Sequence, residues 1–432
     1  MTTQRSIWQT HYYAVVRMYM TLVGIWPYNT IGTKCLHFVT TFTFSFSILI
    51  PQVLYLLNGS IDIDDVFECV PSMVITILFS SKLMFMMINN KKIKACFKMI
   101  EEDWLSLNTD IEKTILRQYT EYGQYLTKFY AIIILVPALF HIIRPFIITM
   151  LLKNDVNIKS SIPGASKLPY RVEYGEKLDQ HFYLIMFHCC LAIFAHVTAT
   201  IAVDGFYYTV MQHACGMFSI IGNMLENIGK NDDANFHLEV KKIKDDNYNM
   251  ALNCLRRHLR VLEFAKLIES IFTNLFLLSV NMNILGGSLC GIQVIMNLNS
   301  AGNIATPLSV YFAQLAHLFL QFWQGQFLLN SSDVPYESIC RGRWYCTSQK
   351  CKKILLLIMC RTMSPCKITA GKIMTLSIET FSVVLKTSMP YFTVLTFPPM
   401  IILKNNRFYI INSFNIIKLY VKFFCPSFSS SF

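Results

Sequence analysis

The sequence carries little charge for its length. Asp, Glu, Lys and Arg make up 15% of its 432 residues, whereas apolar residues make up 53%. A soluble domain of this size carries about 25% charged residues, so this chain has too few to cover a surface that faces water. Its high apolar content is equally incompatible with an unfolded chain. The composition therefore excludes a compact soluble enzyme and a disordered protein, and it predicts an all-α membrane protein with several transmembrane helices.

The sequence also lacks the motifs of common enzymes and metal sites. It contains no hydrolase, kinase, P-loop, zinc-protease or GxGxxG nucleotide pattern. Cys340, Cys346 and Cys351 lie in a basic segment, but their spacing lacks the CxxC pairs of a structural zinc site. Most of the 14 cysteines lie in apolar runs or in that segment, where we expect small buried side chains and reduced thiols. We therefore expect neither catalysis nor a bound metal or cofactor.

A cleavable signal peptide is absent as well, because Arg5 and Arg17 interrupt the first apolar residues. Long apolar runs follow instead, and a transmembrane helix needs about 20 such residues. Seven spans are predicted at residues 35–57, 66–88, 129–152, 181–210, 267–296, 304–329 and 370–396. A short apolar piece at 354–359 precedes the seventh span, and Ser364-Pro365 separates the two. The pattern thus predicts seven transmembrane helices, of which the last is split.

Loop charges predict the orientation of these spans. Loop 58–65 has three Asp and no Lys or Arg, and loop 297–303 has no charged residue. Loops 89–128 and 211–260 each contain seven Lys or Arg, whereas loop 153–180 is mixed. The positive-inside rule places the basic loops, the N-terminus and the break in the last helix in the cytoplasm, and the C-terminus outside.

Two further expectations follow from this orientation. The sequon at Asn58 falls in an outside loop, which makes Asn58 a candidate for glycosylation. Apolar residues at helical spacing within 211–260 predict that the helices extend into the cytoplasm. A G-protein-coupled receptor needs the opposite orientation, and the charge-poor loop 58–65 argues against that class.

The last span combines small, polar and apolar side chains on one stripe. Residues at steps of three and four include Val384, Thr387, Tyr391 and Val394. Glu379 lies on a neighbouring face, and a charge at this depth usually faces water or the interior of a bundle. The stripe is compatible with a helix that lines an ion path, in which Val394 forms an apolar gate. It is equally compatible with a helix that packs in a bundle through Ser and Thr hydrogen bonds.

The outer halves of several spans are rich in aromatic and aliphatic side chains. A pocket for a small molecule needs mostly such side chains together with a few polar groups. The candidates for its lining are Val70, Met73, Phe146, Tyr183, Phe187 and Tyr311. The same residues could instead face lipid or pack in the core, and the sequence alone leaves both interpretations open.

Several motifs resemble those of insect odorant receptors. The segments that carry the resemblance are LVGIWP at 22–27, Asp204 with HACG at 213–216, the stretch 325–345, TFSVVLKTS at 380–388 and YFTVL at 391–395. Pro365 and the Ala370-Gly371-Lys372 tripeptide fit the same pattern. The resemblance covers residues 15–396, and the segments of the last span are its most specific part.

This resemblance implies an odorant-tuned subunit of a ligand-gated, non-selective cation channel in the plasma membrane of olfactory neuron dendrites. Such subunits form heterotetramers with a shared co-receptor, and they bind small volatile ligands between the outer parts of spans two, three, four and six. The seventh span lines the pore, so Val394 would form its apolar constriction. Tyr391, Thr387 and Val384 would lie deeper on the same helix. Membrane lipid is the other expected partner, and nucleic acid is not one.

Two departures from the family pattern affect the end of the chain. Pro390 stands where the family has a small residue, and a Pro inside a helix removes one hydrogen bond. The chain also continues beyond the family's usual end, and residues 397–432 resemble translated non-coding sequence. We therefore expect a cytoplasmic segment at 1–34, a seven-span receptor domain at 35–396 and an atypical tail at 397–432. The alternatives are a gustatory receptor of the same architecture and a G-protein-coupled receptor.

Overall fold

The computed structural model describes residues 7–58, 63–153, 168–175, 180–230, 246–296 and 301–386. Nearly all of this part of the chain is helical. The α-helices are α1 (Ala14–Leu22), α2 (Ile31–Ser47), α3 (Leu49–Asn58), α4 (Ile63–Ile88), α5 (Asn90–Ser106), α6 (Asp110–Lys153), α7 (Phe182–Glu226), α8 (Asp246–Met296), α9 (Ala301–Arg341) and α10 (Gln349–Thr362). Three short 3₁₀-helices are η1 (Ile7–Gln9), η2 (His11–Tyr13) and η6 (Trp344–Cys346), and two strands are β1 (Thr369–Ala370) and β2 (Met374–Thr375). A further helix, here called the last helix, begins at residue 378 and is described as far as 386.

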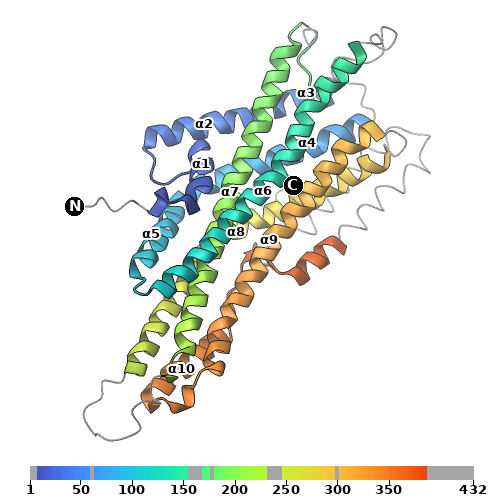
Figure 1. The fold of residues 1–432 in the computed structure, drawn as a ribbon. Coiled ribbons are helices and arrows are strands. Elements are labelled where there is room, and N and C mark those ends of the chain that lie inside the picture. The colour runs from blue at the N-terminus through green and yellow to red at the C-terminus, as the bar shows by residue number, and fades with distance from the viewer. Residues whose placement is uncertain are drawn as a thin grey trace, which may run out of the picture.

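Helix α7 forms the centre of the bundle. It packs against α1, α2, α4, α6, α8 and α9, and its side chains are buried almost continuously from Val197 to Phe218. The long helices α6, α7, α8 and α9 run along one another, and α10 lies at the end of the bundle shown at the bottom of Figure 1. Close approach depends on small residues, as is usual between transmembrane helices. A Cβ atom added at Gly222 would lie only 2.6 Å from the side chain of Val334 on α9.

The predicted spans correspond to observed helices. Within the part of the chain that the structure describes, five helices are long and apolar enough to cross a membrane, namely α2 with α3, α4, α6, α7 and α8. The sixth predicted span falls on α9, which is less apolar because it carries Gln314, His317 and Gln321. The seventh predicted span overlaps the last helix, and residues 387–396 of that prediction lie outside the described part.

The helices also continue beyond the predicted spans, as the pattern in 211–260 predicts. Helix α7 extends to Glu226, and α8 begins at Asp246. The predicted loop 89–128 is largely helical too, because it contains α5 and the first turns of α6. Helix α6 begins with a capping box, in which the Thr109 hydroxyl accepts from the Glu112 N–H at 3.2 Å and the Glu112 carboxylate accepts from the Thr109 N–H at 3.3 Å.

Two predicted spans have different boundaries in the structure. The first is interrupted at Ile48, between α2 and α3, because Pro51 in the next turn has no N–H to donate to the helix ladder. Asn58 is the last residue of α3.

The seventh span begins later than predicted, since Ala370 belongs to the β1–β2 hairpin rather than to a helix. At the tip of this hairpin Gly371 and Lys372 both adopt positive φ angles of 61° and 59°, which breaks any helix. The hairpin is held on α8, where the Gly371 N–H donates to the Thr273 carbonyl at 2.8 Å.

Candidate functional site

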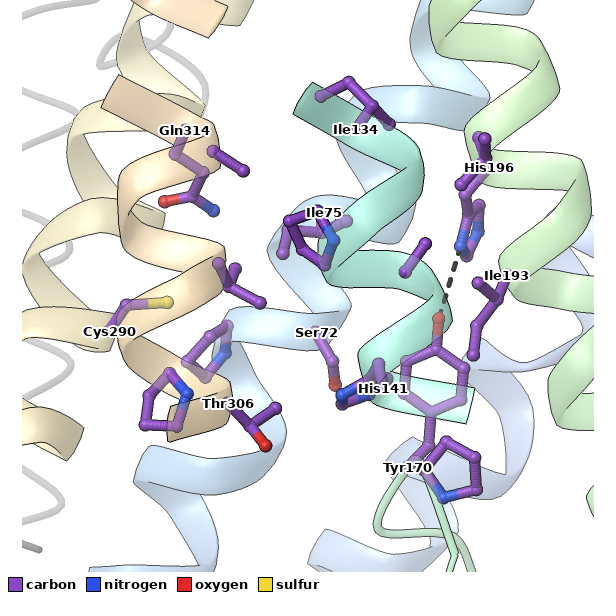
Figure 2. Close-up of a pocket in the computed structure, with 18 of the residues that line it drawn as sticks. Ser72, Ile75, Ile134, His141, Tyr170, Ile193, His196, Cys290, Thr306 and Gln314 are labelled. Atoms are coloured by element: carbon purple, nitrogen blue, oxygen red, sulfur yellow. Dashed lines mark hydrogen bonds between the residues drawn. The ribbon is translucent and has the colours of Figure 1, made fainter. Parts of the chain in front are cut away.

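A cavity of about 420 Å³ lies inside the bundle. Helices α4, α6, α7, α8 and α9 line it, together with a short strap (residues 168–171) that connects α6 to α7. Figure 2 shows the side chains that face it, among them Ser72, Ile75, Ile134, His141, Tyr170, Ile193, His196, Cys290, Thr306 and Gln314. Four of the five helices are those in which the odorant receptor resemblance places the ligand: spans two, three, four and six correspond to α4, α6, α7 and α9.

The size and lining of the cavity fit a small organic molecule. Pockets for such ligands enclose roughly 300–1,000 Å³ and are mostly apolar with a few polar groups. At roughly 30 Å³ per water-sized group, 420 Å³ accommodates about fourteen non-hydrogen groups. Side chains such as Ile75, Leu78, Ile134 and Ile193 supply the apolar surface.

An ion pair joins the strap to α4 beside the cavity. The Arg171 guanidinium donates to the Glu68 carboxylate at 2.5 Å, and both side chains line the cavity. They are 26% and 41% exposed, so this pair lies where the cavity meets solvent. Beyond Arg171, the Glu173 N–H donates to the Pro51 carbonyl at 2.9 Å, and the Cys69 thiol lies between the carbonyls of Gln52 at 3.7 Å and Arg171 at 4.0 Å. These contacts fix the strap across one side of the cavity.

Two histidines and a tyrosine form a second polar group in the wall. His196 Nε2 lies 3.2 Å from the carbonyl oxygen of Ser45, which can only accept, so this nitrogen carries the proton. His196 Nδ1 then accepts from the Tyr170 hydroxyl at 3.4 Å, the contact drawn in Figure 2. The Tyr170 ring also makes an edge contact with the His141 ring, with centroids 5.6 Å apart. The strap is therefore packed against both α6 and α7.

A buried network of Lys82, Tyr130, Asp204, His317 and Gln321 lies at the end of the cavity where His317 forms part of the wall. Lys82 Nζ donates to Asp204 Oδ2 at 2.8 Å, and these side chains are 0% and 1% exposed. A charged pair buried between transmembrane helices is costly unless every hydrogen-bonding group is satisfied.

The hydrogen bonds of this network determine the protonation of His317. The single hydroxyl proton of Tyr130 goes to Asp204 Oδ2 at 2.7 Å, so the Tyr130 oxygen accepts from His317 Nδ1, also at 2.7 Å. His317 Nε2 then accepts from Lys82 Nζ at 3.2 Å and from Gln321 Nε2 at 3.1 Å. His317 is therefore neutral, and the network as a whole carries no net charge.

The network joins five helices at one level of the bundle. Its residues come from α4, α6, α7 and α9, and the Ser279 hydroxyl of α8 donates to the Gln321 side-chain oxygen at 3.4 Å. Paired charges of this kind are rarely found in transmembrane helices unless they serve structure or function. Because His317 also lines the cavity, the network is placed where a molecule in the cavity contacts it.

Helix α9 connects the cavity with the last helix. One turn beyond His317, Phe319 and Phe322 contact the Phe381 ring with centroids 5.5 and 5.8 Å apart. At Gly325, an added Cβ would lie 2.3 Å from the carbonyl oxygen of Leu376, so only glycine permits this approach. The Ile378 N–H donates to the Gln326 side chain at 3.3 Å. Helix α9 thus contacts both the cavity and the segment around the start of the last helix.

A separate ion cluster, here called the inner cluster, lies outside the predicted spans, where α5 meets the helical extensions of α7 and α8. Asp103 of α5 accepts from His213 Nε2 at 3.0 Å and from Arg260 Nε at 2.5 Å. Burial raises the pKa of Asp103, but the hydrogen bonds and charges of His213 and Arg260 outweigh it and hold this pKa below its ordinary value. The cluster ties α5 to the inner ends of α7 and α8.

The sequence-predicted pocket residues lie on the expected helices but not in the cavity wall. Val70, Met73 and Tyr311 are each adjacent to lining residues on α4 and α9, whereas Phe146, Tyr183 and Phe187 are 44%, 82% and 60% exposed. Helices that are apolar on both faces give no sequence signal for which face turns inward. The polar residues of α9 at helical spacing, Thr306, Gln314 and His317, would have been the better signal.

The predicted pore residues fall mostly outside the described part. Thr387, Tyr391 and Val394 belong to the residues 387–432 that the structure does not describe. Val384 is described, and its side chain is only 3% exposed because it packs into the main core of its own chain. The exposed face of this helix contains Glu379, Val383 and Lys386, and the expectation that Val384 lines the pore stays a prediction for the assembled channel.

Comparison with known proteins agrees with this architecture. The model of the family described as 7tm Odorant receptor matches residues 62–389. Odorant receptor Or2 of Anopheles gambiae is 23% identical over 348 residues, which cover 77% of this chain and 85% of that protein. Odorant receptor 13a of Drosophila melanogaster is 21% identical over 228 residues, 49% of this chain and 52% of that protein.

Solved structures share the fold. The insect olfactory receptor OR5 from Machilis hrabei aligns with a TM-score of 0.67 at 13% identity, over 88% of this chain and 96% of that one. Its complex with eugenol gives a TM-score of 0.69 at 13% identity, over 89% of this chain and 99% of that one. The likeness confirms the predicted all-α, seven-span membrane fold.

Proposed function

Because this chain belongs to the 7tm odorant receptor family, we propose that it is the odorant-binding subunit of a non-selective cation channel in the plasma membrane. The observation that carries the proposal is the 420 Å³ cavity between α4, α6, α7 and α9, whose wall continues along α9 to the last helix. A related receptor of the same fold has been solved in complex with eugenol, a small volatile molecule. We assign the cavity as the site for a ligand of that kind.

In this proposal, the ligand opens the channel by shifting the population from the closed to the open conformation. A ligand opens a channel only by binding the open conformation more tightly than the closed one. A difference of about 5.5 kcal/mol in affinity suffices to move a two-state equilibrium from 1:99 to 99:1. Here the ligand contacts α9, and α9 contacts the last helix through Phe319, Phe322 and Gly325. The proposal is that a ligand in the cavity favours the arrangement of α9 in which the last helices are separated.

The channel itself is proposed to be a heterotetramer with a shared co-receptor. In each subunit the last helix would border the central pore, with Val394 as its constriction and Tyr391 and Thr387 deeper along the path. The exposed Glu379 and Lys386 would then face water or a neighbouring subunit. In this arrangement the N-terminus is cytoplasmic and Asn58 is outside.

Current recording tests the proposal directly. The chain is expressed with the co-receptor in oocytes, and odorant-evoked currents are measured across a broad panel of volatiles. The variant Ala313→Phe, which fills the cavity from α9, is expected to abolish the response at unchanged surface expression. The neighbouring Phe312 is 60% exposed, so Phe312→Leu is the matched control and is expected to respond normally. The absence of current to every volatile, with surface expression confirmed, would contradict the proposal.

The orientation has its own test. An epitope tag at the N-terminus is expected to be accessible to antibody only after permeabilisation of the cells. Asn58→Gln is expected to remove a glycan and increase the electrophoretic mobility of the protein. A tag that is accessible on intact cells would instead favour a G-protein-coupled receptor topology.

A further inference from the structure

Three polar atoms in the cavity wall have no hydrogen-bond partner within the described part of the chain. They are the hydroxyl oxygens of Thr200 on α7 and Thr306 on α9 and the side-chain carbonyl oxygen of Gln314 on α9. Thr200 is 1% exposed and Thr306 is 6% exposed. Buried polar atoms are nearly always paired, so these three atoms offer hydrogen bonds to a molecule that enters the cavity.

Other threonines in the same bundle show how such a hydroxyl is usually satisfied. Thr76, Thr127 and Thr209 each donate to the carbonyl four residues earlier in their own helix, at 2.9, 2.9 and 2.8 Å. A threonine inside a helix can always adopt this bond. At Thr200 and Thr306 the hydroxyl lies at the cavity instead and does not make it.

The three atoms are distributed around the wall. Thr306 and Gln314 are eight residues apart on α9, which corresponds to about 12 Å along the helix axis. Figure 2 shows both side chains on the α9 side of the cavity, whereas Ile75, Ile134 and Ile193 lie on other helices together with the polar Ser72, His141 and His196. Gln314 lies directly over two glycines of α8, since a Cβ atom at Gly286 would be 3.0 Å from its amide nitrogen. Its carboxamide is therefore confined by backbone on one side.

The charges near the cavity largely neutralise one another. Glu68 is paired with Arg171, and Lys82 is paired with Asp204 beside a neutral His317. Arg144 also lines the wall and adds one positive charge near the first pair. The oxygens of Thr200, Thr306 and Gln314 are uncharged, so hydrogen bonding to a neutral group is the interaction that they offer.

We propose that the cavity selects neutral ligands that carry an oxygen function on an apolar skeleton: alcohols, phenols, aldehydes, ketones or esters. Either threonine hydroxyl can donate to a carbonyl or ether oxygen, and Gln314 can accept from a hydroxyl. A hydrocarbon of the same shape leaves these atoms unpaired, and sites built to hydrogen-bond a ligand discriminate strongly against analogues that lack the group. This inference rests on the assignment of the cavity as the ligand site made above.

The test uses matched ligand pairs and a binding readout that needs no current. The full-length protein is purified in detergent, and its thermal unfolding midpoint is measured with 1-decanol against undecane and with 2-undecanone against 2-methyl-1-undecene. Compounds are compared at equal vapour activity, which removes their different solubility in detergent. We expect the oxygenated member of a pair to raise the midpoint at an activity at least about ten-fold lower than its hydrocarbon isostere.

Variants of the three residues then test whether these side chains discriminate the oxygenated ligand from its hydrocarbon isostere. The triple variant Thr200→Val, Thr306→Val and Gln314→Met is expected to reduce the ratio between pair members to within about three-fold. Thr209→Val removes a hydroxyl that is already bonded within its own helix, so it is the matched control and is expected to keep the wild-type ratio. If the triple variant does not fold, the wild-type ratio and the three single variants decide the question.

Four outcomes overturn the inference: equal stabilisation by both members of a pair, no stabilisation by any compound, unchanged discrimination in the variants, or stronger stabilisation by decanoic acid than by 1-decanol. The last result would assign recognition to the arginines beside the cavity. Failure of the channel proposal is distinguishable. Selective binding of oxygenated compounds without any current would refute the channel and leave this inference standing, whereas equal currents evoked by hydrocarbons would refute this inference alone.

Discussion

The two polar regions that meet at His317 differ in whether their hydrogen-bonding groups are paired. In the buried network, Lys82, Asp204 and His317 satisfy one another within 3.2 Å and lie out of contact with solvent. In the cavity wall above it, the oxygens of Thr200 and Thr306 have no partner in the described part of the protein. Both regions lie between the same helices, so burial alone does not explain the difference.

We interpret the paired network as a structural element and the unpaired groups of the cavity wall as a recognition site. A satisfied network of charges holds helices at fixed positions, and it is strongly destabilised when one member is removed. An unsatisfied group destabilises the empty protein by about 1–3 kcal/mol, and it is retained only where something else provides the partner. Removing a polar group therefore has opposite effects on the stability of the free protein in the two regions.

The largest effect is expected when the ion pair is broken. Lys82→Met leaves Asp204 charged and buried, which costs about 3–5 kcal/mol of unfolding free energy. The double variant Lys82→Met, Asp204→Leu removes both charges and is expected to recover most of the loss. Thermal unfolding in detergent and surface expression measure both. A Lys82→Met protein as stable as the wild type would show that the ion pair does not stabilise the folded protein.

An intermediate effect is expected at Tyr130, whose hydroxyl bonds both Asp204 and His317. Tyr130→Phe leaves two buried groups short of one hydrogen bond each, so we expect a loss of about 2 kcal/mol. Tyr208 packs edge-on against Tyr130, and its hydroxyl has no partner among the described residues. Tyr208→Phe is thus the matched control, and equal destabilisation by the two variants would argue against a role for the network bonds.

A smaller effect of opposite sign is expected in the cavity wall. Thr200→Val replaces an unpaired buried hydroxyl by a methyl group of similar size and is expected to stabilise the ligand-free protein by about 1 kcal/mol. Thr209→Val on the same helix removes a bonded hydroxyl and is expected to be neutral or slightly destabilising. Unfolding midpoints without ligand compare the two. Destabilisation by Thr200→Val would mean that this hydroxyl is satisfied in the free protein.

The smallest effect concerns the inner cluster, which extends the comparison beyond the membrane. The pKa of Asp103 is depressed in the folded protein, so its contribution to stability is complete above its unfolded pKa of about 3.9 and is lost as the pH falls through the lower folded value. Asp103→Asn removes this titrating group, so the free energy of unfolding is expected to fall less steeply as the pH is lowered. Unfolding measured between pH 6 and pH 3 tests this. The same loss of stability in the variant and the wild type would exclude Asp103 as the cause of that loss.

Much of the fold could be predicted from hydropathy because a membrane span must be long and apolar. The boundaries were less predictable. Pro51 divides the first span, and the left-handed turn at Gly371 and Lys372 delays the last helix, since local backbone conformation overrides an apolar composition. The helical extensions of α7 and α8 could be anticipated from the apolar spacing in 211–260.

The site was predictable by region but not by residue. The family resemblance pointed to four of the helices that line the cavity, while Val70 and Met73 are one position away from the lining residues Pro71 and Ser72. One residue turns a helix by about 100°, and an apolar sequence does not specify which face meets the cavity. Lys82 could have been recognised, because a lysine in a span needs a partner and Asp204 is an acid at similar depth in another span.

The glycine contact between α9 and the last helix has a consequence for how such a receptor can diversify. Helix α9, which contains Thr306 and Gln314, also contacts Leu376 through Gly325, with no intervening element. If α9 couples the cavity to the pore as proposed, a replacement that reshapes α9 for a new ligand also alters the packing at Gly325. We expect such a variant to change the open fraction of the channel without ligand, and to need a second, compensating change near Gly325.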